Sequence, residues 1–91
     1  MNATELTRPL IHSNGTSASA LANDYGLARD ALADALNALG RCYPHGRDYY
    51  HQPATQFTKA QEEHRIRMDK VRSAMFEIAE LEMHCLDFGS K

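Results

Sequence analysis

Tryptophan is absent from this 91-residue sequence, aromatic residues make up only 8% of it, and valine and isoleucine are scarce. Side chains that favour strands are therefore few, whereas alanine, leucine, glutamate, arginine and methionine, which favour helices, are plentiful. The length corresponds to one small domain, near the lower limit for a chain that buries its own core. The composition predicts a single all-α domain over residues 1–91.

The sequence also lacks a strong net charge and a long apolar run. A formal net charge of −2 provides no broad basic field to attract nucleic acid. No run approaches the roughly 20 apolar residues that cross a bilayer. The N-terminus does not show the charged start and apolar core of a secretory signal. We therefore expect a cytoplasmic protein that binds neither membranes nor nucleic acid directly.

Catalytic and metal-binding motifs are missing as well. The sequence contains no G-x-S-x-G, no phosphate-cradling glycine loop and no H-E-x-x-H, so we expect neither an enzyme nor a cofactor. Cys42 and Cys85 are far apart in the sequence and are expected to be reduced in the cytoplasm. Cys42, His45 and His51 follow a C-x2-H-x5-H spacing, but a closed zinc site needs a fourth ligand that is not evident. We expect no metal.

A first helix is predicted over residues 17–39. Thr16 or Ser17 can cap its first turn by accepting a hydrogen bond from a free backbone amide, and Gly40 offers a stop. Apolar or small residues recur at alternating spacings of four and three, which predicts one continuous apolar face: Leu21, Tyr25, Ala28, Leu32, Ala35 and Leu39.

A second, longer helix is predicted over residues 54–88. Pro53 and Thr55 suit its first turn, and Gly89 marks its end. Its apolar face follows the same spacing: Phe57, Ala60, His64, Met68, Val71, Met75, Ile78, Leu81, Cys85 and Phe88. A histidine in such a face is expected to be packed and hydrogen-bonded rather than to bind a metal.

Two helices joined by the short segment 40–53 predict an antiparallel hairpin, with residues 1–15 as an extended N-terminal arm. The second helix is longer by about 12 residues, and its C-terminal third is apolar on more than one side. A two-helix hairpin of this size buries little surface alone. We therefore expect a helical homo-oligomer with this interface: Met75, Phe76, Ile78, Met83 and Leu86.

The part of the connecting segment at 42–53, CYPHGRDYYHQP, is rich in side chains that recognise ligands. Gly46 allows a tight turn, Arg47 offers planar donors to phosphate or carboxylate, and Asp48 can orient that arginine or accept from a ribose or base edge. Flat faces for stacking or packing come from three tyrosines, Tyr43, Tyr49 and Tyr50. Two interpretations remain open: a binding surface, or a structural lid on the end of the hairpin.

The arm ends in a second polar stretch, HSNGTS at 12–17. Asn14, Thr16 and Ser17 lie beside the free amides of a helix N-terminus, which attract anions, and His12 is a further candidate. Ordinary helix capping is the alternative. In a single hairpin this stretch and the connecting segment lie at opposite ends of the first helix. They can meet only across a subunit boundary or if the arm folds back.

The stretches LIHSNGTS at 10–17 and HGRDYY at 45–50 resemble a group of small helical proteins of tailed phages and prophages. Those proteins pair an I-H-x-N-G-T-S stretch with a helix, an N-G-R-D-Y-Y joint and a long charged helix. The resemblance covers most of the chain from residue 10 onwards, but His45 stands where the group has asparagine. It implies a phage or mobile-element origin, with the host cytoplasm as the place of action. It brings no established activity.

Two functions follow as expectations. The first is a non-enzymatic oligomer that sequesters a nucleotide-like anion, with Arg47 and the tyrosines as its clamp, by architectural analogy with small helical anti-defence proteins of phages that trap cyclic nucleotides. The second is an interaction module that docks on a host or defence protein through the 42–53 segment and inhibits it.

Overall fold

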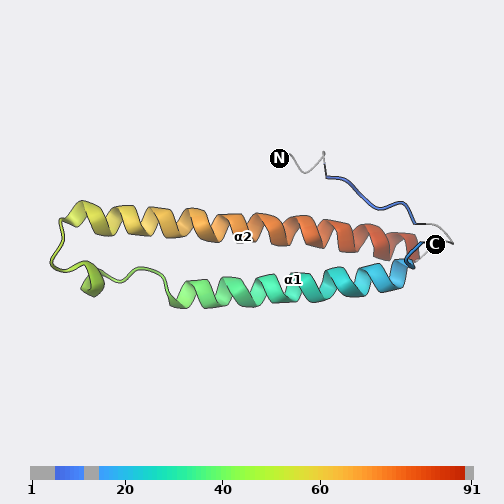
Figure 1. Ribbon diagram of the computed structural model, residues 1–91, viewed down its shortest axis with the longest axis horizontal. Coiled ribbons are helices and arrows are strands. Elements are labelled where there is room, and N and C mark those ends of the chain that lie inside the picture. The colour runs from blue at the N-terminus through green and yellow to red at the C-terminus, as the bar shows by residue number, and fades with distance from the viewer. Residues whose placement is uncertain (1–5, 12–14, 90–91) are drawn as a thin grey trace.

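The computed structural model describes residues 6–11 and 15–89, which form two long helices and one short 3₁₀ helix. Helix α1 covers Ala18–Arg41, η2 covers Gly46–Tyr49 and α2 covers Ala54–Gly89. The helices α1 and α2 lie side by side and antiparallel in a body 62 Å long (Figure 1). The expected all-α hairpin is confirmed for the described residues, which contain no strand. None of the helices in this part of the chain is long and apolar enough to cross a membrane.

The start of α1 agrees with the predicted cap, whereas its end does not. The side chain of Ser17 accepts a hydrogen bond from the backbone amide of Ala20 at 3.1 Å. The helix continues through Gly40 to Arg41, so the predicted stop at Gly40 is wrong. The backbone amide of Cys42 closes the last turn by donating to the carbonyls of Leu39 and Gly40. No glycine in the described residues has a positive φ, so this end does not need a left-handed residue.

The buried core is small, and on α1 it consists of small residues beside the predicted apolar face. The predicted apolar faces are half-buried along most of their length, but Phe88 is exposed, contrary to prediction. The buried apolar side chains are Ala18, Ala22 and Cys85. The two alanines lie on the line that continues to Gly26, beside the predicted face. An added Cβ at Gly26 would approach the Glu82 carboxylate within 2.9 Å, so these small residues make room for α2.

Polar contacts fix how far along each other the two helices sit. Arg29 of α1 forms an ion pair with Glu82 of α2, whose side chain is only 12% exposed. Towards the other end, the imidazole of His64 bonds to the carbonyl of Leu39 at 2.8 Å. These pairings align the start of α1 with the end of α2. The first turns of α2 therefore extend beyond the end of α1.

The surplus length of α2 is covered by the connecting segment of the same chain. Helix α2 has 36 residues and α1 has 24. The ring of Tyr49 in η2 packs against Phe57 with centroids 5.8 Å apart. A Cβ at Gly46 would stand 3.8 Å from the same phenylalanine ring. The length difference alone therefore does not require a second subunit.

The described part of the N-terminal arm folds back along the C-terminal half of α2 (Figure 1). Arg8 forms an ion pair with Glu80 at 2.9 Å, and the carbonyl of Pro9 bonds to the imidazole of His84 at 2.9 Å. The side chain of Leu10 is 85% exposed. The arm is therefore attached mainly by polar contacts, and it remains at the end of the hairpin opposite the connecting segment.

The outer face of α2 carries ion pairs between residues three or four positions apart. Arg65 bonds to Glu62 at 2.6 Å and to Asp69 at 2.7 Å, and Arg72 bonds to Asp69 at 2.6 Å. The hydrogen bond and the charge of Arg65 lower the pKa of the Glu62 carboxyl. Pairs at these spacings stabilise the helix in which they occur.

Candidate binding pocket at the closed end

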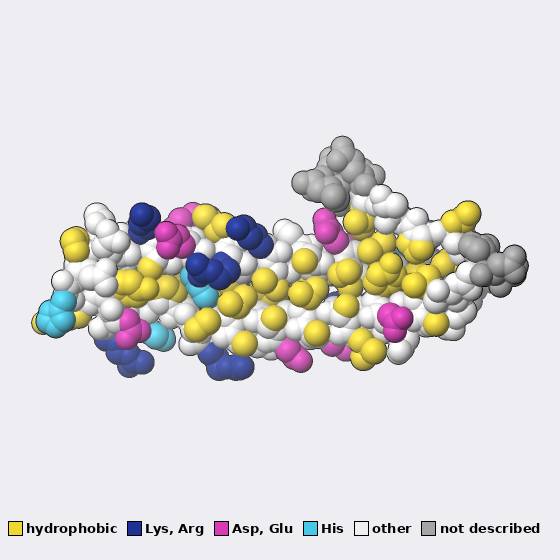
Figure 2. Space-filling view, in the orientation of Figure 1, with side chains coloured by type: hydrophobic (Ala, Val, Ile, Leu, Met, Phe, Trp, Pro, Cys, Tyr) yellow, Lys and Arg dark blue, Asp and Glu magenta, His cyan; other side chains and the backbone are white. Residues whose placement is uncertain are grey.

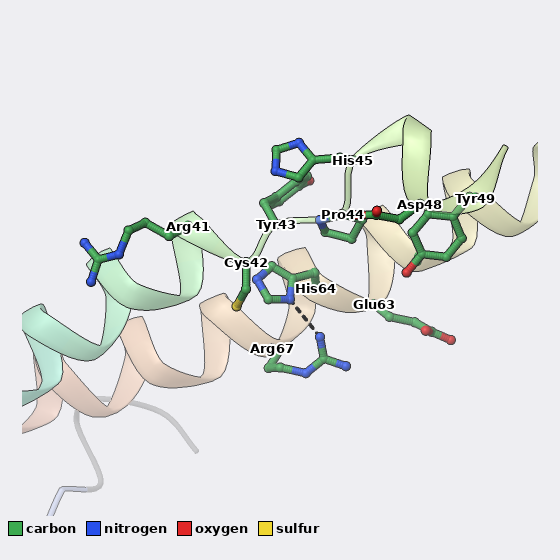
Figure 3. A pocket seen from close by; sticks show the side chains of 11 residues that line it. Arg41, Cys42, Tyr43, Pro44, His45, Asp48, Tyr49, Glu63, His64 and Arg67 are labelled. Carbon is green, nitrogen blue, oxygen red and sulfur yellow. Dashed lines mark hydrogen bonds between the residues drawn. The ribbon is translucent and has the colours of Figure 1, made fainter.

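The closed end of the hairpin, where residues 42–53 connect the helices, contains a pocket of about 420 Å³. It lies between the end of α1, the connecting segment and the projecting part of α2 (Figure 3). Its lining combines cationic, acidic and aromatic side chains: Arg41, Cys42, Tyr43, Pro44, His45, Asp48, Tyr49, Ala60, Glu63, His64 and Arg67. This volume falls in the range of small-molecule sites, roughly 300–1,000 Å³.

His64 lies at the base of this pocket and both of its ring nitrogens are bonded. The side chain is 4% exposed. Its Nε2 lies 2.8 Å from the Leu39 carbonyl, which can only accept, so Nε2 carries the proton. Its Nδ1 lies 2.8 Å from Nη1 of Arg67, which can only donate, so Nδ1 is the acceptor. These two bonds select one neutral tautomer and make His64 a hydrogen-bonded link between the helices.

Arg67 is the arginine that the pocket holds in a defined orientation. One Nη1–H donates to His64, and the rest of the guanidinium remains accessible, because the residue as a whole is exposed. Figure 3 shows Arg67 on the same side as Glu63, while Arg41 points back along α1. A planar guanidinium that is held through one donor keeps other donors for an oxyanion.

Two of the three predicted tyrosines pack onto α2. Tyr43 meets the ring of His64 edge-on, with centroids 5.3 Å apart and planes at 89°. Tyr49 packs on Phe57 and also lines the pocket. Gly46 faces the same phenylalanine, so it serves close packing as much as a turn. The packing of these three residues agrees with the interpretation of the segment as a lid.

Arg47 and Tyr50 are arranged differently. Both are exposed and neither lines the pocket. Tyr50 is 78% exposed and contacts only the ring of His51, at 4.8 Å, among the ring contacts of the described residues. An Arg47–Asp48 pair, one of the alternatives that the sequence left open, is not among the ion pairs of the described chain. Asp48 lines the pocket instead.

The described part of the second polar stretch does not join this pocket within one chain. Thr16 and Ser17 precede α1 at the opposite end of the hairpin (Figure 1). Ser17 acts as the helix cap, which is the simpler of its two predicted roles. His12 and Asn14 lie outside the described residues. The arm folds back over α2, but it reaches only the region of Glu80 and His84.

Both thiols are free in the structure: Cys42 is exposed and Cys85 is buried. The Sγ of Cys42 donates to the Leu39 carbonyl at 3.4 Å. Within residues 6–11 and 15–89, no three His, Cys, Asp or Glu side chains come together closely enough to hold a metal ion.

Sequence reasoning did not single out Arg67 or Glu63 and treated His64 only as a packed residue. The available signal was the spacing His64-x-x-Arg67, which places a donor one turn from a histidine in the apolar face. It is weak, because many charged residues lie three positions from an apolar face in any amphipathic helix. Asp48 and Glu63 line the same pocket only because of the path that the connecting segment takes, and no local sequence pattern indicates that path.

The contrast between packed and exposed side chains gives a direct test of the lid. Tyr49→Ala is expected to lower the free energy of unfolding by about 1–3 kcal/mol, because it removes a ring that packs on Phe57. Tyr50→Ala, the matched control, should change it by less than about 0.5 kcal/mol. Urea denaturation followed by circular dichroism measures both. Equal losses in the two variants would contradict the different roles assigned to these rings.

No family model, curated protein or solved structure matches this chain. Function is therefore inferred from the residues themselves and from their arrangement.

Proposed function

We propose that this chain is a non-enzymatic accessory protein that binds a nucleotide-like anion in the closed-end pocket and acts as a homo-oligomer. The observation that carries the proposal is the Arg67 guanidinium, which His64 holds at 2.8 Å in a pocket that also contains two tyrosines. In this proposal the charged anchor is Arg67, not Arg47, which the sequence suggested.

The chemistry of the lining fits the parts of a nucleotide. Free donors of Arg67 suit a phosphate oxygen, because bonds between a guanidinium and an oxyanion are stronger than neutral ones. Tyr43 and Tyr49 offer aromatic surface for a base. Asp48 and Glu63 can accept hydrogen bonds from a ribose hydroxyl or an exocyclic amine. The same carboxylates repel a bare polyanion, so the lining favours a ligand with both charged and neutral polar groups.

The thiol geometry supports binding rather than covalent chemistry. Cys42 is the nucleophilic side chain in the pocket lining. The candidate bases are His45, which is close to Cys42 in the sequence, and His64, which lines the same pocket. Its sulfur donates to the carbonyl of Leu39, however, and the nitrogens of His64 are already engaged. An activated cysteine would need a base as its partner.

The phage-type resemblance of residues 10–17 and 45–50 supports a role in the cytoplasm of an infected host, where sequestering a nucleotide signal would blunt a defence response. This role as an anti-defence protein is part of the proposal and depends on the ligand class.

A second candidate is supported by the tip of the connecting segment. Arg47 and Tyr50 are exposed, and neither lines the closed-end pocket. Arginine and tyrosine dominate binding hot spots between proteins. This alternative is a module that docks on a host or defence protein through residues 42–53.

A thermal-shift and calorimetric titration with mononucleotides and cyclic dinucleotides tests the ligand. A binder is expected to raise the melting temperature of the wild type by mass action. Arg67→Ala should weaken that ligand by at least about tenfold, since a charge-assisted hydrogen bond contributes roughly 1.5–3 kcal/mol. Arg65→Ala is the matched control, because it removes the same charge from the same helix outside the pocket.

The outcomes separate the two candidates. Loss of binding in Arg67→Ala, with Arg47→Ala and Tyr50→Ala unaffected, supports the pocket. Loss in Arg47→Ala and Tyr50→Ala alone would move the site to the tip. A wild type that ignores the whole panel would refute the nucleotide ligand and leave the docking alternative.

A further inference from the structure

The hairpin exposes more surface than a globular chain of its size. Its accessible surface is 6690 Å² for 10.2 kDa, whereas the surface of a monomeric protein of this mass is about 5,300 Å². The radius of gyration is 18.5 Å, against about 12 Å for a compact domain of this length. The excess of about 1,400 Å² is larger than the roughly 800 Å² that each partner contributes to a standard interface.

Three of the exposed large apolar side chains lie on one line of α2, on a flank of the helix beside the face that packs against α1. Phe76, Met83 and Leu86 are 59%, 54% and 48% exposed. With Ala79 they recur at spacings of three, four and three, the pattern of a coiled-coil contact. We call these four residues the apolar strip. Of the predicted interface residues, Met75 and Ile78 are half-buried in the face that continues to Cys85, so they belong to the hairpin itself.

Most of the apolar strip lies in a groove that is bordered by the N-terminal arm and by a group of charged side chains. A groove of about 610 Å³ lies over Phe76, Ala79 and Met83, and Arg8 of the folded-back arm forms part of its wall. Towards the closed end the strip stops at the charge network of Arg72 and Asp69. On the face shown in Figure 2, Lys and Arg side chains gather near the closed end, whereas hydrophobic side chains run along the whole body and are densest towards the other end.

We propose that the apolar strip binds the same strip of a second copy of this chain, with the two α2 helices antiparallel. A coiled-coil contact has two kinds of position that alternate along each helix. When the helices are antiparallel, each layer joins a position of the first kind on one helix to a position of the second kind on the other. Phe76 then lies opposite Leu86 of the second copy, and Ala79 lies opposite Met83. The twofold axis passes at the level of Leu81. All four strip positions are covered in four consecutive layers.

A second copy fits this groove because the twofold rotation places large side chains of one strip opposite small or flexible side chains of the other. The smallest residue, Ala79, meets the long and flexible Met83, so the layers fill without two large side chains colliding. The two carboxylates nearest the axis, Glu80 and Glu82, already have Arg8 and Arg29 as their partners, so two copies can approach without bare charges facing each other. An isologous contact of this kind closes as a dimer and leaves no free copy of the strip.

The proposed dimer rests on the proposed function in one respect, namely that the chain self-associates. It does not depend on the proposed ligand site. The twofold axis lies near the end of α2 and the pocket lies near its beginning. The two closed ends therefore point in opposite directions, and each pocket is built from one chain. Ligand binding and dimer formation can be tested separately.

Light scattering during size-exclusion chromatography tests the contact. The wild type is expected to be a dimer at micromolar concentration, and Phe76→Asp should raise the dissociation constant at least about tenfold by placing an unpaired charge in the contact. Leu27→Asp is the matched control, since Leu27 is a 62% exposed apolar residue of α1 outside the strip. Circular dichroism verifies that both variants keep their helices.

Cross-linking tests the antiparallel order and does not rely on weakening the dimer. In a Cys42→Ser background, chains with Ala79→Cys are mixed with chains with Met83→Cys and treated with a short bis-maleimide; Cys85, 1% exposed, stays unreactive. The mixture should cross-link several-fold faster than either variant alone. Equally fast reaction of Ala79→Cys alone would mean parallel helices and overturn the proposal.

The failures can be told apart. A wild-type dimer that Leu27→Asp breaks and Phe76→Asp does not would overturn the apolar strip while leaving self-association intact. A monomeric wild type would overturn the dimer and the oligomeric part of the proposed function together. Neither result changes the meaning of the Arg67→Ala titration, which reports on the pocket of a single chain.

Discussion

His64→Ala is expected to lower the free energy of unfolding by about 2–4 kcal/mol, the largest effect of a single truncation within one chain. The imidazole is 4% exposed and bonds to the Leu39 carbonyl and to Arg67. Its removal eliminates both bonds, leaves a cavity under Tyr43 and releases the guanidinium. The melting temperature should fall by about 10–20 °C. Urea denaturation and thermal melting followed by circular dichroism measure the loss.

Two comparisons show whether the bonds or the volume matter. His64→Gln keeps an amide that can donate to Leu39, so it should be less destabilising than alanine. His51→Ala, in the exposed part of the connecting segment, should change stability by less than about 0.5 kcal/mol. An alanine variant at position 64 as stable as the His51 control would show that the link between the helices contributes nothing. Ligand affinity should fall in His64→Ala as well, because Arg67 loses its orientation.

Arg29→Ala is expected to cost about 1–3 kcal/mol, because it leaves the Glu82 carboxylate, 12% exposed, without its partner on the other helix. The guanidinium is itself 42% exposed, so water screens part of the interaction and the cost stays below that of a fully buried pair. Gly26 gives the carboxylate its room, since no side chain stands where it lies. Chemical denaturation of the variant measures the effect.

A double-mutant cycle with Glu82→Gln isolates the interaction between the two side chains. Arg29→Ala should cost less in the Glu82→Gln background than in the wild type, by about 0.5–2 kcal/mol. Arg65→Ala, which removes exposed ion pairs within α2, is the matched control and should cost less than about 1 kcal/mol. Additive losses at positions 29 and 82 would show that the pair does not help to align the helices.

The candidate site was only partly predictable from the sequence. The composition of residues 42–53 pointed to the closed end, and Tyr43, Tyr49 and Asp48 do line the pocket there. The choice of Arg47 as anchor depended on its position in the loop, and the structure leaves that residue at the exposed tip. Which arginine reaches the pocket depends on how the segment returns to α2. No local pattern in the sequence contains that information.

By itself the sequence determined the two helices, most of their apolar faces and the cap at Ser17. These features depend on interactions between residues three or four positions apart, and local chemistry decides them. It did not determine how far along each other the helices sit, because a face that repeats every seven residues fits equally well after a shift of seven. The tertiary structure decided this through two polar pairs, His64 with the Leu39 carbonyl and Arg29 with Glu82. Those pairs place the connecting segment over Phe57, where Tyr49 packs, because a buried hydrogen-bonding group is stable only where its partner is present. Arg67 is then oriented by its own hydrogen bond to His64.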